Sequence, residues 1–502
     1  MEKPKVRISV RNLVEFILRS GDLDNSRGSS GDKEAMLKGG RLHRKIQRSM
    51  KGNYQAEVSL KRESEYEDTI IQVEGRADGI FTEDGEVWID EIKGTYGNLQ
   101  AMEMPVPVHR AQAMCYGWIY GEKEGLSQIG IQMTYSHLDT EDTRRFREIF
   151  SMEELKKWYQ ELLDAYHKWI AYSLSWKKER NASMTDLQFP FPYREGQREI
   201  VSGVYHTVSS KKTLFVQAPT GVGKTMSAIF PSVRAIGEGK GETLFYLTAK
   251  TITGTVAWEA FHTLRENGLK FKVTAITAKE KLCFLDSPEC TPEKCPYAKG
   301  HFDRVNDAVY ELWTTEEVYS REVIRAHAEK WQVCPFEMCL DLSVWVDGVI
   351  CDYNYAFDPN VHLKRFFGEN ISGDYIFLID EAHNLVERGR EMYSAEVSRQ
   401  TLLTLRKKIR KHFPKLARVL EKANRQMLEL EEDLKASQNP YQVLSNPGVL
   451  PITFLTISGE LEEILEEKNL DEELRKEILE FYFVVRDFLN VSELVDENYV
   501  VY

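Results

Sequence analysis

The chain carries Gln217-Ala-Pro-Thr-Gly-Val-Gly-Lys-Thr225 directly after the apolar run Leu214-Phe-Val216, and this combination sets the fold class. A Gly-rich turn between a buried strand and a helix is typical of a nucleotide-phosphate cradle, because backbone N–H groups can approach phosphate oxygens there. Lys224 reaches the β- and γ-phosphates, and Thr225 offers a hydroxyl to Mg²⁺. Ala218 stands where the usual pattern has its first glycine. The pattern predicts an α/β nucleotide-binding domain.

A second motif, Ile376-Phe-Leu-Ile-Asp-Glu-Ala-His383, is an apolar run that ends in two carboxylates. It predicts a parallel strand that ends beside the phosphate cradle, where Asp380 would hold Mg²⁺ and Glu381 would orient the attacking water. The alternative is an acidic pair on the surface after a core strand. Upstream, Phe189-Pro-Phe-Pro-Tyr-Arg-Glu-Gly-Gln197 offers the side-chain amide of Gln197, which could read the two edges of adenine.

Together, these three segments resemble the first motor domain of a superfamily-two helicase. The resemblance implies a RecA-like parallel-sheet domain that binds ATP with Mg²⁺. The nucleotide-binding residues expected from it are Arg194, Gln197, Thr220, Gly221, Val222, Gly223, Lys224, Thr225 and Asp380, and Glu381 is the expected catalytic residue.

The cysteines are clustered. Of the seven in the chain, one group comprises Cys283, Cys290 and Cys295, a second comprises Cys334, Cys339 and Cys351, and Cys115 stands alone. A cytosolic nucleotide enzyme is not expected to use disulfides, so clustered thiols indicate metal ligands. Four thiolates hold either tetrahedral zinc or a [4Fe–4S] cluster, and the spacing does not decide between them.

The place of these cysteines, between the two nucleotide motifs, resembles the XPD/DinG helicases. In that family a four-cysteine iron–sulfur domain is inserted there, with its last ligand in a Cys-Pro-aromatic step such as Cys334-Pro-Phe336. The similarity extends over residues 185–502. It implies that a [4Fe–4S] cluster is bound by Cys283, Cys290, Cys295 and Cys334, with Cys339 as a competing candidate and Cys351 as a buried apolar residue.

The same resemblance implies where DNA binds. Lys250 and Thr251 match the motif that touches the DNA backbone, and the residues expected to meet single-stranded DNA near the cluster are Lys299, His301 and Arg304. The family moves 5′ to 3′ along single strands. Forked or single-stranded DNA is therefore the expected partner, and DNA repair is the expected setting.

The first 180 residues predict a different chemistry. Two strands, Glu74–Ile80 and Trp88–Gly94, flank an acidic turn and would present Asp78 and Glu91 at adjacent strand ends. Lys93 falls on the same face as Glu91, because side chains alternate along a strand. Two carboxylates and a lysine suit a Mg²⁺ or Mn²⁺ nuclease, in which the metal lowers the pKa of bound water.

Two helical segments give this pattern its context. Gly39-Gly-Arg-Leu-His43 precedes the carboxylates, and His109-Arg-Ala-Gln112, with Tyr116 one turn later, follows them. In this order the residues resemble the RecB-type PD-(D/E)XK nucleases. The resemblance implies His43, Asp78, Glu91 and Lys93 as the catalytic set, His43, Asp78 and Glu91 as metal ligands, Glu57 as a weaker candidate ligand, and Gln112 and Tyr116 as DNA-facing. No cysteines flank this segment, so it is expected to lack a cluster of its own.

The composition is that of a multidomain soluble enzyme. The chain has 502 residues, 42% hydrophobic and 29% charged, and no apolar run is long enough to span a bilayer. We expect a cytoplasmic monomer that does not contact membranes. The net charge of −13 predicts weak long-range attraction to DNA, so binding must rest on local basic patches such as Arg406–Lys411. That patch is also consistent with a solvated helix face.

The C-terminal part is predicted to be helical. A heptad seam is formed by Leu416, Leu420, Ala423, Met427, Leu430 and Leu434, and Pro414 separates it from an earlier helix over Leu402–Phe413. A further helix is expected over Leu461–Leu489. The arrangement resembles the arch of the XPD/DinG proteins, and a self-associating coiled coil is the alternative.

The expected domains are a PD-(D/E)XK nuclease-like domain at 1–180, helicase domain 1 at 181–278 and 342–395, an iron–sulfur insertion at 279–341, and a helical arch at 396–502. The polar stretch Lys177–Asp186 is the expected junction. The chain ends at Tyr502 with no Gln-x-x-Gly-Arg-x-x-Arg segment of a second motor lobe, so we expect a fragment, or a partner that supplies that lobe, and impaired ATP turnover. The predicted function is an ATP-dependent DNA helicase-nuclease. The alternatives are a non-catalytic, ATP-gated DNA-binding subunit and an ATP-independent nuclease with a relic motor.

Overall fold

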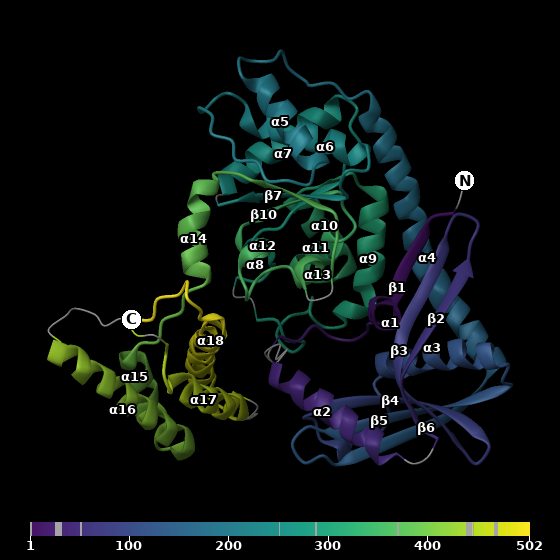
Figure 1. Cartoon of the computed structure of the whole chain (residues 1–502), viewed down its shortest axis with the longest axis vertical. Coiled ribbons are helices and arrows are strands. Elements are labelled where there is room, and N and C mark those ends of the chain that lie inside the picture. Colours follow the sequence, from purple (N-terminus) through teal and green to yellow (C-terminus); the bar gives the residue numbers. More distant parts are fainter. Residues whose placement is uncertain are drawn as a thin grey trace. The chain divides into compact units, whose positions relative to one another are not determined.

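The structure is a computed structural model that describes residues 3–25, 33–50, 53–249, 251–286, 289–368, 371–437, 444, 446–465 and 470–502 (Figure 1). The chain divides into two compact units. One comprises Met1–Phe245, Thr255–Ile350 and Asp374–Leu378, and the other comprises Tyr246–Gly254, Cys351–Gly373 and Ile379–Tyr502.

A six-stranded mixed sheet organises the N-terminal part of the first unit. Its strands are β1 (Lys5–Ser9), β2 (Gln55–Glu65), β3 (Ile70–Glu83), β4 (Glu86–Thr95), β5 (Gln128–His137) and β6 (Thr143–Ser151). The order is β1-β3-β4-β5-β6 with β2 also paired to β3; β1 is parallel to β3 and β4 to β5, and the other pairs are antiparallel. The two strands predicted from the acidic turn are present within β3 and β4.

Helices surround this sheet. Apolar residues of α1 (Val10–Ile17), α3 (Pro107–Glu124) and α4 (Met152–Thr185) form one buried core with the strands. The α2 helix (Lys33–Ser49) instead packs Leu42 and Ile46 on Ile92 and Leu138. Close approach needs glycine at two points of β3: a Cβ on Gly75 would lie 2.7 Å from the Tyr116 hydroxyl oxygen, and one on Gly79 would lie 1.9 Å from that of Tyr54.

The expected junction at Lys177–Asp186 lies within a helix, because α4 continues through it to Thr185. The helix starts with a capping box, in which the side chains of Ser151 and Glu154 each bond the other's backbone N–H. Near its end the helix is held by Asp347, whose carboxylate accepts from Trp176 Nε1 at 2.8 Å and pairs with Arg180 at 2.7 Å. A buried acidic partner far along the chain therefore keeps this polar stretch helical.

The second sheet is the RecA-like part of an α/β fold. It contains β7 (Thr243–Thr248), β8 (Val273–Ala275), β9 (Val318–Tyr319), β10 (Gly348–Asp352) and β11 (Tyr375–Ile379) in the order β11-β7-β10-β8-β9. The β10–β8 and β8–β9 pairs are parallel. Around β7 in the sequence lie three helices: α5 (Gln197–Ser209) and α6 (Lys224–Gly237) precede this strand, and α7 (Thr251–Glu266) follows it.

The strand predicted over Leu214–Val216 is wrong. Within the described residues this segment has no regular structure, and the Phe215 side chain is 87% exposed. Apolar character favours a strand only where a neighbouring strand can pair with it, and this segment pairs with none of the strands described above.

The remaining helices are short in the cysteine-bearing region and long at the C-terminus. They are α8 (Lys279–Leu282), α9 (His301–Thr315), α10 (Arg321–Trp331), α11 (Pro335–Ser343), α12 (Asn354–Phe357), α13 (Lys364–Phe367), α14 (Leu385–Met392), α15 (Arg399–Ile409), α16 (Pro414–Ser437), α17 (Leu450–Leu465) and α18 (Glu472–Leu494), with the 3₁₀ turns η1 (Leu99–Ala101) and η2 (Ala382–Asn384). None of the helices in the described residues is long and apolar enough to cross a membrane.

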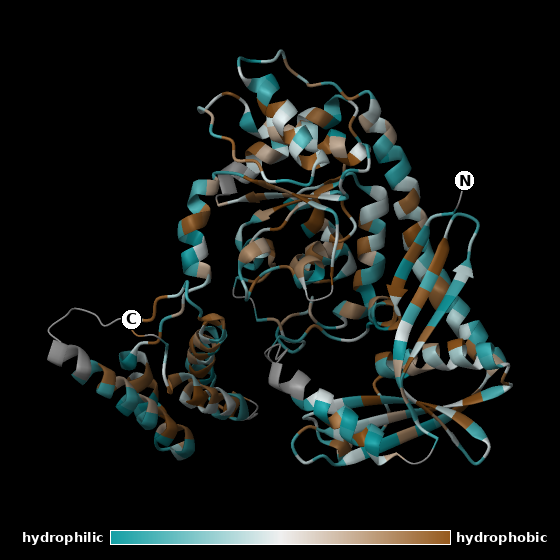
Figure 2. Cartoon of the chain, viewed as in Figure 1, coloured by the Kyte–Doolittle hydropathy of each residue, from teal (hydrophilic) through white to brown (hydrophobic). Residues whose placement is uncertain are grey.

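The C-terminal helices pack against one another as a helical group (Figure 2). The first three seam positions, Leu416, Leu420 and Ala423, are buried in a core shared with α15, α17 and α18. The side chain of Leu434 lies outside the described residues. The single helix predicted over Leu461–Leu489 is wrong, because α17 ends at Leu465 and α18 begins only at Glu472.

Candidate active sites

The phosphate cradle has the backbone that its glycines predict. Gly221 and Gly223 take φ values of 84° and 83°, the left-handed region that glycine adopts at no steric cost. Helix α6 begins directly at Lys224, so the turn ends at a helix N-terminus, where free N–H groups favour anions. The Lys224 ammonium donates to the Ala218 carbonyl at 2.9 Å, which holds it against the same loop.

Gln197 and Arg194 hold this loop in place. The Gln197 amide is 4% exposed; its Nε2 donates to the Val222 carbonyl at 3.0 Å, and its Oε1 accepts from the Arg194 backbone at 3.0 Å. The Arg194 guanidinium donates to the Gly221 carbonyl. Both ends of the amide are thus engaged by backbone groups, so in this structure Gln197 positions the cradle and presents no free edge to adenine.

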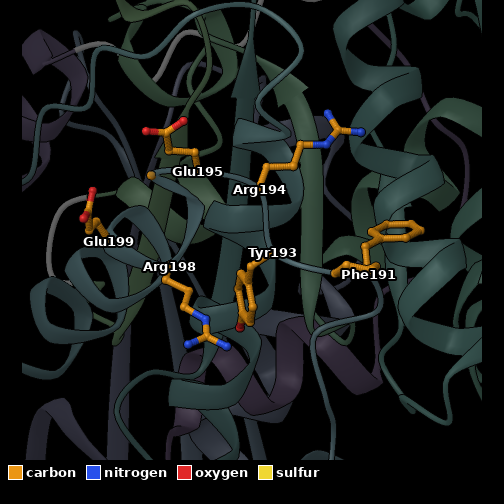
Figure 3. Close-up of a pocket in the computed structure, with 8 residues that line it drawn as sticks. Phe191, Tyr193, Arg194, Glu195, Arg198 and Glu199 are labelled. Carbon is orange, nitrogen blue, oxygen red and sulfur yellow. The ribbon is translucent and has the colours of Figure 1, made fainter.

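A cavity of about 590 Å³ is lined in part by Arg194 and is drawn in Figure 3. Its lining combines aromatic and charged side chains: Phe191, Pro192, Tyr193, Arg194, Glu195, Gly196, Arg198 and Glu199. The Tyr193 ring stacks on Phe189 at 4.4 Å and carries the Arg198 guanidinium at 5.0 Å from its centroid. An aromatic face next to hydrogen-bonding groups suits a flat heterocycle such as a nucleobase.

The acidic pair follows β11 as predicted and lies in the second unit. The Asp380 N–H donates to the Leu247 carbonyl at 2.9 Å, which continues the pairing of β11 with β7. The Tyr353 hydroxyl donates to the carbonyls of Asp380 and Glu381. Glu381 has a left-handed φ of 49°, and its carboxylate lies 3.4 Å from His383 Nδ1. These bonds hold the backbone that carries the two carboxylates.

The residues predicted to touch the DNA backbone are Lys250 and Thr251. Lys250 lies outside the described residues, and Thr251 is the first residue of α7.

In the N-terminal module, the predicted nuclease residues come together from α2, β3 and β4. Asp78 Oδ2 accepts from the Ile92 N–H at 2.7 Å, and Asp78 Oδ1 lies 3.6 Å from His43 Nδ1. The Lys93 ammonium lies 2.8 Å from Glu91 Oε1. Glu91 Oε2 is buried and has no hydrogen-bond partner among the described residues. An imidazole and carboxylates, one with an unused oxygen, are ligand types that Mg²⁺ or Mn²⁺ accepts, although among the described residues these side chains are not arranged as a group that holds a metal ion.

The burial of Glu91 changes its acidity. Its side chain is 2% exposed, and burial, reinforced by the charge of Asp78, raises its pKa to about 8, against the opposing effect of Lys93. A neutral carboxyl at pH 7 is therefore expected in the metal-free site. Perturbed acidity of this kind is common in functional sites.

Gln112 and Tyr116 lie behind Lys93. Gln112 Oε1 accepts from the Lys93 ammonium at 3.1 Å, and Gln112 Nε2 is 3.5 Å from the Tyr116 hydroxyl. Both side chains are buried, so this structure places them as supports of Lys93. Glu57 is 2.6 Å from Arg76 Nε and accepts from Gln47 Nε2 at 3.0 Å, so its carboxylate is engaged near the site.

Three of the four predicted cluster cysteines are buried close together. Cys295 and Cys334 belong to one apolar cluster, and Cys290 lies near enough to Cys334 to raise the pKa of the Cys334 thiol, although burial is the larger cause. Cys283 is partly exposed and accepts from the Leu285 N–H at 3.4 Å. Across the described residues, no group of three or more His, Cys, Asp or Glu side chains is arranged to hold a metal ion.

The two other late cysteines have separate surroundings. Cys339 is fully buried in α11, with its sulfur 3.6 Å from Thr274 Oγ1 and 3.8 Å from the Ala275 carbonyl oxygen of β8. Cys351 is 3% exposed in β10, as expected for a buried apolar residue.

The basic residues proposed to meet DNA near the cysteines have structural partners. His301 is fully buried, and its Nδ1 accepts from the Cys334 N–H at 3.2 Å. The Arg304 guanidinium donates to the carbonyls of Lys299, Trp331 and Gln332. His301 is therefore buried away from the surface in this structure, and both side chains hold the turn around Cys334.

Two residues of the C-terminal basic patch, and Lys415 beyond it, pair with acids. Arg406 pairs with Glu421 at 3.0 Å, Lys408 with Glu477, and Lys415 with Glu460 at 2.6 Å. These pairs agree with a solvated helix face.

One contact of the cysteine region comes from the N-terminus and was not predicted. Leu23 is 6% exposed and shares the apolar cluster of Cys295 and Cys334. Its N–H donates to the Ala298 carbonyl at 2.8 Å, and the Asn25 N–H donates to the Cys290 carbonyl at 2.9 Å. The segment that follows α1 therefore covers the cysteines, and no sequence pattern marks it.

Leu23→Asp is expected to uncover these thiols. A carboxylate in that apolar cluster has no partner, so the segment should leave it rather than bury the charge. Alkylation of Cys295 and Cys334, followed by mass spectrometry on the protein as purified and on metal-stripped protein, should accelerate about tenfold or more in the variant. Leu23→Met, which conserves volume, should behave like the wild type. Equal alkylation rates in all three proteins would show that Leu23 does not cover the cysteines.

Comparison with known proteins agrees with the sequence motifs. Residues 264–402 match the DEAD_2 family model. The chain is 23% identical over 261 residues to the regulator of telomere elongation helicase 1 homolog of Caenorhabditis briggsae, covering 43% of this chain and 26% of that protein. It is 40% identical over 201 residues to a probable ATP-dependent helicase of Methanocaldococcus jannaschii, covering 39% of this chain and 29% of that protein.

A solved structure titled XPD_Helicase aligns at 17% identity with a TM-score of 0.38, covering 60% of this chain and 51% of that one. The alignments with the C. briggsae and M. jannaschii proteins cover less than a third of each of those two proteins. The DEAD_2 segment contains the clustered cysteines and the Asp-Glu-Ala-His motif, and the phosphate cradle precedes it. Over these segments the chain is similar to the XPD/DinG-like superfamily-two helicases.

Proposed function

We propose that this chain is an ATP-dependent DNA helicase joined to a metal-dependent DNA nuclease. The observation that carries the second activity is the convergence of His43, Asp78, Glu91 and Lys93 from three elements onto one site. Similarity to ATP-dependent helicases supports ATP use and a DNA substrate, with single-stranded or forked DNA as the proposed partner. In a chain with both sites, ATP binding and DNA cleavage should depend on different residues, so that a substitution can remove one activity and leave the other.

On the motor side, the cradle would receive the triphosphate. The α6 N-terminus and the two glycines supply backbone donors, and Lys224 supplies a mobile positive charge. Mg²⁺, when bound with ATP, would neutralise developing phosphate charge, and Thr225 and Asp380 are the residues proposed to hold it. Glu381 is proposed to orient the attacking water.

On the nuclease side, a divalent cation would supply an activated water and Lewis-acid stabilisation of the phosphate. His43, Asp78 and Glu91 are the residues proposed to hold it. Lys93, kept in place by Gln112 and paired with Glu91, would orient water or neutralise charge at the scissile phosphate. Burial of Glu91 excludes competing water from that side.

The nuclease should depend on pH through Glu91. Below about pH 8 its carboxyl carries a proton that the cation must displace, so metal affinity should rise roughly tenfold per pH unit from pH 6 and level off above pH 8. Titration calorimetry with Mn²⁺ at several pH values measures this rise and the proton released. A flat affinity profile would contradict the prediction.

Stability of the metal-free module gives an independent readout. Above pH 4.5 the unfolded chain loses the Glu91 proton, while the folded chain keeps it up to about pH 8. Stability from this group is therefore lost as pH rises across that window. Glu91→Gln, which stays neutral, should raise the Tm of EDTA-treated protein at pH 8 and have a smaller effect at pH 5.

We also propose that Cys283, Cys290, Cys295 and Cys334 bind a [4Fe–4S] cluster. The burial of Cys290, Cys295 and Cys334 side by side supports this set, and thiolates are the ligands that such clusters use. Iron and sulfide analysis of anaerobically purified protein, with visible absorbance, tests it. A colourless protein that contains zinc and no iron would replace the cluster with a zinc site.

A non-catalytic, ATP-gated DNA-binding subunit is the second candidate function. Conformational switching without turnover would need ATP binding but neither hydrolysis nor cleavage. Measuring ATP hydrolysis with and without single-stranded DNA, together with DNA cleavage in Mn²⁺, distinguishes the two. Cleavage that is indifferent to Lys224→Ala would instead favour an ATP-independent nuclease.

A further inference from the structure

Helix α2 lies directly on the proposed nuclease site. Leu42 and Ile46 are buried against Ile92, which fixes the inner face of the helix. On that side His43 reaches Asp78 at 3.6 Å, and Gln47 Nε2 donates to the Asp78 carbonyl at 2.9 Å. Any strand of DNA whose phosphate enters this site must pass close to α2.

One flank of α2 has its charges neutralised. Lys38 pairs with Asp139 at 3.1 Å, and Lys45 pairs with Glu141, both acids in the turn between β5 and β6. These lysines fasten the helix to the sheet. They offer little net charge to a ligand.

The other flank carries arginines. Arg41, Arg44 and Arg48 are all exposed, and none of them makes an ion pair or a side-chain hydrogen bond with another described residue. With about 100° per residue, Arg44 and Arg48 lie about 100° and 140° around the helix from His43. Figure 2 shows hydrophilic colouring on the described part of α2.

Two glycines leave the helix surface beside His43 open. Gly40 lies about 60° around the helix from His43, between it and Arg44. A Cβ on Gly40 would come within 3.8 Å of only one other group, Arg44 Nη1, and one on Gly39 would meet nothing within 4 Å. A sugar-phosphate chain can therefore approach the helix backbone beside His43 and meet the Arg44 guanidinium.

We propose that Arg44 and Arg48 form a phosphate-binding flank that holds the backbone of the DNA strand being cleaved. The proposal rests on the proposed nuclease function and adds the surface that receives its substrate. In a chain of net charge −13, unpaired guanidinium groups beside a cleavage site supply the local attraction that the molecule as a whole lacks. Guanidinium forks suit phosphate oxygens, and such contacts position a strand without reading its sequence.

The test compares two double variants that remove the same charge from the same helix. R44A/R48A removes the arginines that pair with none of the described residues, and K38A/K45A removes the paired lysines, about 60° to 120° further around the helix. With a single-stranded oligonucleotide in Mn²⁺, R44A/R48A should raise KM about tenfold and leave kcat within about twofold, because uniform binding is lost. K38A/K45A should leave KM near the wild-type value. Arg44→Lys/Arg48→Lys, which keeps the charge, should recover most of the affinity.

Salt dependence gives a second measurement that needs no cleavage. In EDTA, each phosphate contact to a single strand contributes about 0.7 to the slope of log affinity against log salt, so R44A/R48A should lower that slope by about 1.4. K38A/K45A should not change it. Thermal melts of all variants establish that they are folded.

The outcomes separate the surface from the activity. If the wild type cleaves DNA but neither KM nor the salt slope changes in R44A/R48A, the flank is overturned. Equal losses in both double variants would also overturn it, because they would reflect total charge alone. If the wild type does not cleave DNA but the slope falls only in R44A/R48A, the nuclease assignment fails and the DNA-binding flank stands.

Discussion

Lys224→Ala is expected to abolish ATP binding and, with it, all ATP hydrolysis by this chain. Lys224 is the first residue of α6 and its ammonium rests on the Ala218 carbonyl of the cradle, 2.9 Å away. A triphosphate in the loop would replace that carbonyl as its partner. Losing one preorganised charge of this kind costs about 10²–10³-fold in rate, in addition to lost affinity. Fluorescent-nucleotide titration and a phosphate-release assay measure the two effects.

Lys240→Ala is the matched control for this variant. Lys240 is an exposed lysine just beyond the C-terminal end of the same helix, so its removal changes the charge equally without touching the cradle. It should bind ATP like the wild type. If Lys224→Ala binds ATP as tightly as Lys240→Ala does, the turn around Lys224 is not the nucleotide site.

Asp78→Ala is expected to abolish metal-dependent DNA cleavage while leaving ATP binding unchanged. The Asp78 carboxylate accepts from the Ile92 N–H at 2.7 Å and faces His43, so it is held toward Glu91 with little freedom. Removing one ligand of a catalytic cation forfeits several kcal/mol of charge stabilisation, or about 10³-fold in rate. Gel assays with Mn²⁺ and single-stranded DNA measure the loss.

Two further variants make this result specific. Asp78→Asn keeps the acceptor for the Ile92 N–H and removes the charge, so it should fold normally and still fail to cleave. Glu67→Ala, an exposed acid before β3, should cleave like the wild type. Wild-type cleavage by Asp78→Asn would remove the nuclease assignment, and the ATP titration in the same samples shows whether the motor is intact.

The local chemistry of both sites could be predicted from the sequence. Glycines at 221 and 223 require a left-handed turn at those positions, whatever the rest of the chain does. The carboxylates of Asp380 and Glu381 follow a strand because an apolar run precedes them. Alternation along β4 places Glu91 and Lys93 on one face, whereas the grouping of these two with His43 and Asp78 follows from the resemblance to the PD-(D/E)XK nucleases.

The partners of those residues could not be predicted. Whether the Gln197 amide faces a base or the Val222 carbonyl depends on how closely α5 approaches the cradle. Gln112 could equally have faced solvent on its helix, and only the packing of α3 on the sheet turns it toward Lys93. Side-chain direction at such positions is decided by neighbours distant in sequence.

By itself, the sequence determined the turns, the strand ends and the order of the chemical groups, because these depend on the conformational limits of single residues and on short periodicities. Only the tertiary structure decided that α4 runs unbroken to Thr185 with Asp347 as a partner, that Leu23 covers the cysteines, and that Leu214–Val216 lies outside the sheet. Each of these depends on burial against residues far along the chain. The hydrophobic effect is non-directional, so a short sequence pattern does not indicate which distant residues will bury a given side chain.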